Sequence, residues 1–233
     1  MEIDLVNEKL KLEHIGLSNL KSIMYNLNDS ALVNQAISRK EGQIGYGGAF
    51  FVKTGTHTGR SARDKFIVRE EKTEKNIWWE NSGEMSEEHF SSLYNDIKKY
   101  LQGKEIFVQD LFACADENHR MNIRVITELA WHALFSRHLF RIPEEKNIKN
   151  FINDFTVINC PEFKSSPERH GSSSETIIAI SFEKKLIIIS GTLYAGEIKK
   201  SVFTVLNYFL PEKNVMPMHC SANTAKSDDK NSA

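Results

Sequence analysis

Apolar residues recur along the chain with two different periods, and each period predicts one class of element. A period of about 3.6 residues predicts amphipathic helices, whereas short β-branched runs between turn residues predict strands. The clearest helix covers residues 196–210, and Pro211 ends its pattern. Its apolar face consists of Ile198, Val202, Val205, Leu206 and Phe209. Further helices are predicted over residues 30–41, where Ser30 can cap the start, over residues 86–101, which begin at Ser86, and over residues 127–140, which begin at Thr127.

Two apolar runs, residues 176–182 and 185–190, flank a short charged turn and predict a β-hairpin. Because strands and helices alternate and the strand directions are mixed, the sequence predicts an α/β fold with a mixed sheet packed with helices. Residues 69–90 are highly charged and are expected on the surface, anchored by Ile77, Trp78 and Trp79; residues 144–150 are expected to form a turn. The other predicted strands cover residues 46–53, 65–69, 105–109, 123–126 and 155–159.

Composition narrows the functional classes. The 233 residues suffice for one large domain or two small ones, and a net charge of −1 argues against nucleic-acid or membrane-surface binding. No apolar run approaches the ~20 residues that span a bilayer, and the acidic N-terminus has no secretory-signal pattern. The cysteines, Cys114, Cys160 and Cys220, are widely spaced and odd in number, which indicates free thiols in a reducing compartment. We therefore expect a cytoplasmic protein, and a monomer.

The segment from Thr54 to Ser61 is the first candidate for chemistry. Its glycines, Gly55 and Gly59, let the backbone approach a ligand, and Arg60 supplies a planar fork suited to a carboxylate or phosphate. The spacing does not fit a P-loop, which needs four residues between its glycines followed by Gly-Lys-Ser/Thr. A tight turn with a solvated arginine is an equally open interpretation.

The second candidate places Lys199 and Lys200 in the first turn of the helix predicted over residues 196–210. The positive end of the helix dipole and the repulsion between adjacent ammonium groups both favour a neutral amine. A neutral lysine can bind a metal ion, whereas an anion bound at the helix start would relieve the repulsion instead. Lys200 lies about 200° around the helix from Ile198 at ~100° per residue, so it points away from the core. A solvated lysine pair at a frayed helix start is the alternative.

The third candidate is the segment from Met216 to Asn223, which contains His219. A lone histidine is more often structural than a ligand, so residue type alone favours a packed loop residue here. Cys220 is not expected to pair with His219 as nucleophile and base, because adjacent side chains of an extended chain point to opposite faces.

Taken together, these three segments resemble the ATP-dependent phosphoenolpyruvate carboxykinases. The resemblance runs in order along nearly the whole chain. Besides the three segments, it includes Glu41-Gly42, Trp78-Trp79, Gln109-Asp110-Leu111-Phe112, Arg124, Thr127 to His132, Ser174-Glu175-Thr176 and Leu206-Asn207-Tyr208.

The resemblance implies an enzyme of gluconeogenesis that converts oxaloacetate and ATP to phosphoenolpyruvate, ADP and CO₂. It implies that Arg60 binds the substrate carboxylate. It also implies that Tyr194 and Gly196 line the pocket for oxaloacetate or CO₂.

For the two lysines and the histidine, the resemblance implies direct roles in catalysis. Lys199 is expected to contact substrate or to assist phosphate transfer. Lys200 and His219 are expected to bind Mn²⁺ (or Mg²⁺) as cofactor and to contact ATP, with Lys200 also at the substrate. The argument from the helix dipole agrees with a metal-binding Lys200.

The sequence departs from the family at two loop positions and at its end. Ala62 stands where the family usually has proline, and Cys114 where glycine is usual. The family continues into a mononucleotide domain with a P-loop, which does not occur before Ala233. We therefore expect residues 1–212 to form the N-terminal substrate-binding domain and residues 213–233 to begin a truncated C-terminal nucleotide-binding domain. The chain alone is expected to be inactive; the alternative is a non-catalytic remnant that binds a dicarboxylate or a partner.

Overall fold

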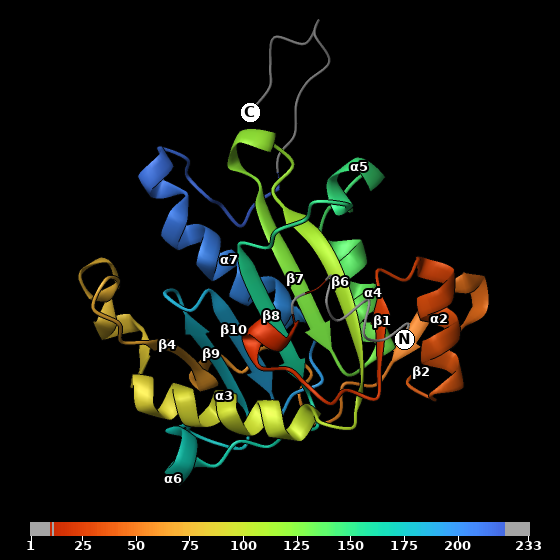
Figure 1. Cartoon of the computed structure of the whole chain (residues 1–233), viewed down its shortest axis with the longest axis horizontal. Coiled ribbons are helices and arrows are strands. Elements are labelled where there is room, and N and C mark those ends of the chain that lie inside the picture. The colour runs from red at the N-terminus through yellow and green to blue at the C-terminus, as the bar shows by residue number, and fades with distance from the viewer. Residues whose placement is uncertain (1–9, 11, 222–233) are drawn as a thin grey trace, which may run out of the picture.

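A mixed eight-stranded sheet forms the centre of the protein in the computed structural model, which describes residue 10 and residues 12–221 (Figure 1). Counted along the sheet, the second and third strands pair antiparallel, and so do the fifth and sixth; all other neighbouring strands are parallel. The prediction of an α/β fold with a mixed sheet is therefore confirmed. The sheet order is β1 (Ser22–Tyr25), β6 (Glu105–Ala113), β7 (Met121–Thr127), β8 (Phe155–Cys160), β10 (Leu186–Ser190), β9 (Ile177–Ser181), β4 (Lys65–Val68) and β5 (Gly83–Met85).

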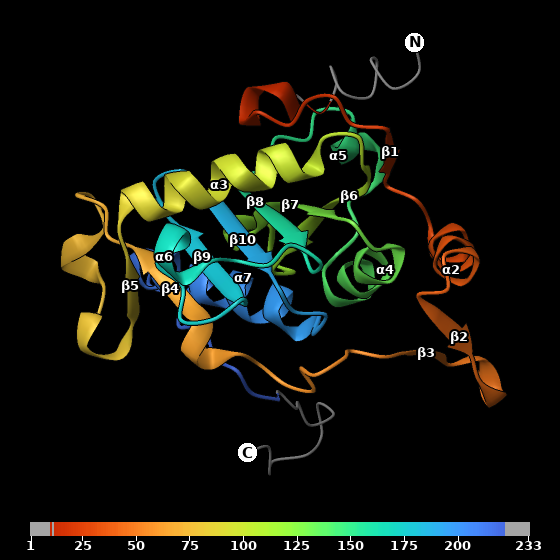
Figure 2. The same ribbon diagram turned by 90° about the horizontal axis from the view of Figure 1, so that it is seen from below.

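Helices cover both faces of this sheet (Figure 2). One face carries α3 (Glu87–Leu101) with the short α6 (Pro167–His170) packed beside it. The opposite face carries α4 (Ala130–Leu139) and α7 (Gly196–Phe209), and α2 (Asp29–Ser38) packs on α4 beyond the edge of the sheet. The connection from α4 to β8 contains α5 (Glu145–Ile148). Single 3₁₀ turns occupy Leu12–Ile15, Tyr46–Gly48, Ala62–Asp64, Glu74–Asn76, Trp79–Asn81, Glu117–His119 and Pro211–Lys213.

Strand β6 shows how the core is divided. Ile106 and Val108 pack in the cluster under α3, while Phe107 packs against α4 and Leu111 packs in the cluster under α7. All four side chains are fully buried. Burying such a side chain contributes roughly 1.5–3 kcal/mol to the free energy of folding. Because helices cover both faces of this strand, its sequence is a nearly continuous apolar run and does not alternate with polar residues.

Several predicted elements are confirmed because their signals are local. Ser86 caps α3 by accepting a hydrogen bond from the backbone N–H of His89 (3.1 Å). Strands β9 and β10 pair as the predicted antiparallel hairpin, and α7 ends one residue before the expected Leu210. Helix α2 starts one residue earlier than predicted, because Asn28 rather than Ser30 caps it.

The single strand predicted over residues 46–53 is wrong. The chain instead forms a separate hairpin from β2 (Gly42–Ile44) and β3 (Phe50–Val52), joined through the 3₁₀ turn at Tyr46–Gly48. Gly47 and Gly48 have φ of 82° and 83°, which supports a reversal of the chain and not an extended strand.

The predicted start of α4 at Thr127 is also wrong, because Thr127 is the last residue of β7. The helix begins at Ala130, and its first amides are satisfied by a distant side chain. The carboxylate of Glu41 accepts hydrogen bonds from the backbone N–H groups of Ala130 (3.2 Å) and Trp131 (2.9 Å). This carboxylate at a helix N-terminus satisfies orphan donors and complements the helix dipole.

The surface location predicted for residues 69–90 is wrong for part of the segment, because Gly83–Met85 forms the edge strand β5 and Met85 and Phe90 are buried. Two of the three predicted anchors are confirmed. Ile77 and Trp79 pack against the cluster under α7, and the Trp79 indole N–H donates to the carbonyl oxygen of Glu74 (2.9 Å). Trp78 is 67% exposed, so its predicted role as an anchor is wrong. Likewise, residues 144–150 contain the short helix α5 in addition to a turn.

The remaining predictions concern the cysteines, membrane-spanning helices and the domain boundary. All three cysteines are free thiols, as predicted. Within residue 10 and residues 12–221, no helix combines the length and the apolar character that crossing a bilayer requires. The domain boundary expected near residue 212 stays a prediction, and residues 222–233 of the second expected domain lie outside the described residues.

Candidate active site

A tight loop of residues 191–195 leads from β10 into α7. Gly191 has a φ of +72°, and a Cβ at this position would overlap the backbone carbonyl of Glu175. Only glycine fits both conditions. The hydroxyl of Thr192 accepts a hydrogen bond from the backbone N–H of Tyr194 (3.1 Å), which closes the loop before the helix starts. The sequence therefore fixes where α7 begins relative to the sheet.

Two contacts hold the loop of residues 54–61 against the start of α7. The backbone N–H of Ser61 donates to Glu197 Oε1 (2.6 Å). His57 Nε2 lies 3.3 Å from the hydroxyl of Thr176, and that hydroxyl donates to the carbonyl oxygen of Gly191 (2.9 Å). Two of the three segments selected from the sequence are thus brought together, although more than 130 residues separate Ser61 from Glu197.

Glu197 is the key residue that the sequence analysis missed. Its side chain is buried, and burial raises the pKa of its carboxyl, while the Ser61 N–H and the charges of Arg60 and Lys65 act in the opposite direction. A signal for its burial does exist in the sequence. Glu197 precedes Ser201 by four residues and Val205 by eight, and all three lie on the buried face of α7.

Lys200 and His219 meet at the exposed side of α7. Lys200 Nζ lies 3.2 Å from His219 Nδ1, and the ring of Phe203 lies beside both groups, with its centroid 5.5 Å from Lys200 Nζ and 5.9 Å from the His219 ring. The positive charges of Lys200 and Lys199 lower the pKa of His219, and Arg60 adds a smaller effect of the same sign. A lowered pKa favours the neutral form of this imidazole.

Four of the six predicted site residues therefore share one electrostatic environment. We call Arg60, Lys199, Lys200 and His219 the cationic cluster. Arg60 and Lys199 are exposed, and Lys200 is half-buried. Such a concentration of positive charge on a chain with a net charge of −1 is suited to an anionic ligand.

Lys65 supports the cluster from β4 and was also missed. Its ammonium donates to the hydroxyl of Thr204 (3.0 Å), which in turn donates to the carbonyl oxygen of Lys200 (2.9 Å). Burial lowers the pKa of Lys65, with a further contribution from the charge of Arg60. Lys65 thus links the central sheet to the turn of α7 that carries Lys200.

The remaining two predicted residues, Tyr194 and Gly196, contact each other at the first turn of α7. A Cβ on Gly196 would overlap the Tyr194 ring, so glycine allows the ring to lie over the start of the helix. Both residues are half-buried. They precede Lys199 and Lys200 by about one helical turn.

The Lys200–His219 pair fits part of the coordination shell of a divalent cation. It offers two nitrogen atoms: the lowered pKa of His219 favours a ring nitrogen with a free lone pair, and Lys200 would bind only as the neutral amine. Divalent cations such as Mn²⁺ and Mg²⁺ take about six ligands. Within the part of the chain that the structure describes, no group of three or more His, Cys, Asp or Glu side chains is arranged to hold a metal ion. The pair would therefore supply two positions of such a shell.

Comparisons with known proteins agree with the resemblance seen in the sequence. Residues 21–232 match the protein family described as phosphoenolpyruvate carboxykinase. The phosphoenolpyruvate carboxykinase (ATP) of Paracoccus denitrificans is 54% identical over 228 residues, and that of Ruegeria sp. (strain TM1040) is 53% identical over 228 residues; each covers 98% of this chain and 43% of the relative. The corresponding protein of Cereibacter sphaeroides (strain ATCC 17029 / ATH 2.4.9) is 51% identical over all 233 residues, which are 44% of its length. The chain thus spans less than half the length of the curated relatives it matches.

Proposed function

Because the chain belongs to the ATP-dependent phosphoenolpyruvate carboxykinase family, we propose that its cationic cluster forms the substrate side of an active site that converts oxaloacetate and ATP to phosphoenolpyruvate, ADP and CO₂. The contact between Ser61 and Glu197 carries this proposal, because it holds the Arg60 loop against the helix of Lys199 and Lys200. The guanidinium of Arg60 itself stays exposed and is accessible to a ligand.

The proposed roles follow from the chemistry of the side chains. Oxaloacetate is a dianion, and the planar guanidinium of Arg60 suits one of its carboxylates. Loss of CO₂ leaves an enolate, whose negative charge the nearby ammonium of Lys199 stabilises before its oxygen receives the γ-phosphoryl group of ATP. Tyr194 and Gly196 line the pocket for oxaloacetate or for the departing CO₂.

Lys200 and His219 would hold a divalent cation, Mn²⁺ or Mg²⁺, as two of its protein ligands. A divalent cation at this position supplies charge neutralisation for the enolate and the phosphates. The 3.2 Å separation of the two nitrogen atoms and the lowered pKa of His219 support this assignment. Lys200 Nζ lies within hydrogen-bond distance of His219 Nδ1, so the two nitrogen atoms are already close together.

The proposal extends to the cellular setting. We place the protein in the cytoplasm as an enzyme of gluconeogenesis, and as a monomer. Free thiols at all three cysteines support a reducing compartment.

The 233 residues alone are expected to form no phosphoenolpyruvate from oxaloacetate and ATP. The sequence contains no Gly-x₄-Gly-Lys-Ser/Thr motif to hold the γ-phosphate in line with the enolate oxygen. Joining the chain to the carboxyl-terminal part of the Paracoccus denitrificans relative is expected to give activity in a coupled assay. Lys200→Ala in the joined protein should abolish it. A folded but inactive joined protein would refute the carboxykinase proposal and leave the alternative of a dicarboxylate-binding protein.

Oxaloacetate binding by the chain itself tests the role of Arg60. Charge-assisted hydrogen bonds contribute about 1.5–3 kcal/mol, so Arg60→Ala is expected to weaken binding about 10- to 100-fold. The matched control is Arg63→Ala, which removes another exposed charge three residues away. Calorimetric titration measures both variants. Equal loss of affinity in the two would mean that Arg60 acts only through general charge.

A further inference from the structure

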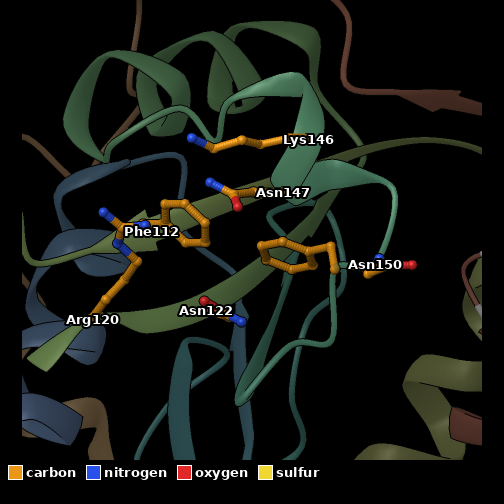
Figure 3. Close-up of a pocket in the computed structure, with 7 residues that line it drawn as sticks. Phe112, Arg120, Asn122, Lys146, Asn147 and Asn150 are labelled. Atoms are coloured by element: carbon orange, nitrogen blue, oxygen red, sulfur yellow. The ribbon is translucent and has the colours of Figure 1, made fainter. Parts of the chain in front are cut away.

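A second pocket, separate from the cationic cluster, opens between the β6–β7 pair and the connection from α4 to β8 (Figure 3). Its volume is about 340 Å³, enough for a small molecule. The walls are made by two phenylalanine rings, two cationic side chains and three asparagines. None of the seven described residues that line it is acidic. The pocket is therefore rich in hydrogen-bond donors and lacks a carboxylate of its own.

Arg120 is oriented in this pocket by an aromatic ring. Its guanidinium carbon lies 4.3 Å from the centroid of the Phe112 ring, and Phe112 stacks with Phe151 at a centroid distance of 5.9 Å and an interplanar angle of 26°. A guanidinium stacked on a ring face keeps its N–H edge available for an in-plane acceptor. The packing therefore fixes the plane of the guanidinium before any ligand arrives.

The Nε of Arg120 is buried and has no hydrogen-bond partner among the described residues. A buried donor without an acceptor costs about 1–3 kcal/mol, so an unpaired one in a folded protein marks a place where an acceptor is missing. In Figure 3, the nitrogen atoms of Arg120, Lys146 and Asn147 lie on the same side of the pocket around Phe112, whereas Asn150 points away. The donor edge of Arg120 thus has two further donors near it.

The acidic partners of these cations lie outside the pocket wall. Glu117 Oε1 is 3.3 Å from Arg120 Nη2, and Glu144 Oε2 is 2.8 Å from Lys146 Nζ, but the two carboxylate side chains are 83% and 71% exposed. Ion pairs with such exposed partners contribute about 0–1 kcal/mol. A ligand that offers several acceptor oxygens can therefore displace these carboxylates at little cost.

We propose that this pocket binds the phosphate group of a small molecule through Arg120, Lys146 and Asn147. A phosphate offers strong acceptor oxygens to all three donors at once, and its charge matches the two cations. The phenylalanine rings then provide an apolar wall for the rest of the molecule. Free inorganic phosphate and a phosphate monoester share this chemistry. Phe112 also lines a neighbouring apolar pocket whose wall includes Lys199.

The test is a titration of the ¹⁵N-labelled 233-residue chain, followed by NMR at the Arg120 Nε–H and the Asn147 side-chain amide. Inorganic phosphate and glycerol 3-phosphate are the two probes, with sodium chloride at equal ionic strength as reference. Saturable shifts of both signals by either phosphate probe are expected. A tighter response to the monoester would assign the site to a phosphorylated metabolite, and an equal response would assign it to the free anion.

Matched variants separate this site from the cationic cluster. Arg120→Gln is expected to weaken the response at Asn147 at least tenfold by removing a charged donor (about 1.4 kcal/mol per factor of ten). Lys146→Gln, at a position where the side chain is 77% exposed, is expected to weaken it several-fold. Arg60→Ala should leave it unchanged. The proposal is overturned if chloride produces the same shifts, if succinate binds as tightly as phosphate, or if Arg60→Ala alone abolishes the response.

Discussion

Replacing Asp110 by alanine is expected to lower the free energy of unfolding by about 3–5 kcal/mol, the range for breaking a buried ion pair from one side. Asp110 is 1% exposed and receives a two-pronged contact from Arg124, which is 6% exposed. Arg124 Nε donates to Oδ1 (2.7 Å) and Nη2 donates to Oδ2 (2.8 Å). The alanine variant leaves the guanidinium buried without its counter-charge.

Two further contacts enlarge the effect. The hydroxyl of Tyr25 donates to Asp110 Oδ2 (2.8 Å), and Arg124 Nη1 donates to the carbonyl oxygen of Leu10 (2.6 Å). The pair therefore ties β6 and β7 to the first strand of the sheet and to the chain that precedes it. Replacing both partners, as in Asp110→Leu with Arg124→Met, should cost less than the single change, because no charge is then left buried.

Urea unfolding followed by circular dichroism measures these differences. Lys164→Ala is the matched control, because Lys164 and its partner Glu175 are 67% and 66% exposed and their ion pair is worth at most about 1 kcal/mol. A cost for Asp110→Ala no larger than that of Lys164→Ala would contradict the structural role assigned to the buried pair.

Lowering the pH from 7 to 5 is expected to destabilise the protein through His132 by about 2 kcal/mol. This side chain is fully buried, and burial lowers its pKa from 6.5 to about 4. The unfolded chain therefore binds a proton between these two values that the folded chain does not bind. Stability from this group is complete above pH 6.5 and is lost as the pH falls toward 4, by about 1.4 kcal/mol per unit.

The hydrogen bonds of His132 explain why the neutral ring is required. Its Nε2 donates to the carbonyl oxygen of Leu193 (2.9 Å), because a carbonyl can only accept. Its Nδ1 then accepts from the side-chain amide of Asn159 (3.0 Å). A proton on Nδ1 would face that amide N–H, so the doubly protonated ring has no place in the core.

Urea unfolding of wild type and His132→Gln at pH 7 and pH 5 isolates the contribution of His132 to the free energy of unfolding. Glutamine does not titrate, and its terminal amide can keep the donor toward Leu193. The loss of stability between the two pH values should be about 2 kcal/mol smaller in the variant, since all other titrating groups are shared. Equal losses in both proteins would show that His132 does not titrate in this window.

The elements that sequence reasoning predicted well carry their determinants within a few residues. The apolar stripe of α7 and the Ser86 cap of α3 are both local signals. The start of α4 depends instead on Glu41, which is 89 residues away from the amide of Ala130. No local pattern encodes such a cap, and Thr127 offered a plausible but incorrect one.

The candidate site follows the same division. Residue types and helix position singled out Lys200, and resemblance to a family added His219, but only the fold brings their nitrogen atoms within 3.2 Å. The buried Glu197 was overlooked because an acid in a first helical turn is ordinarily a solvated group that favours the dipole. Its role depends on the backbone of Ser61, which a sequence pattern does not reveal.

Glu41 and Glu197 have one more consequence when taken together. Glu41 accepts hydrogen bonds from the first amides of α4, and Glu197, in α7, accepts one from the Ser61 amide. The stretch between residues 41 and 61 includes Arg60. That stretch is therefore held at both ends by hydrogen bonds to residues of helices that pack on the same face of the sheet. An arginine loop ordinarily loses conformational entropy when it binds its ligand. Here much of that entropy is already lost on folding, so more of the contact energy is available as affinity.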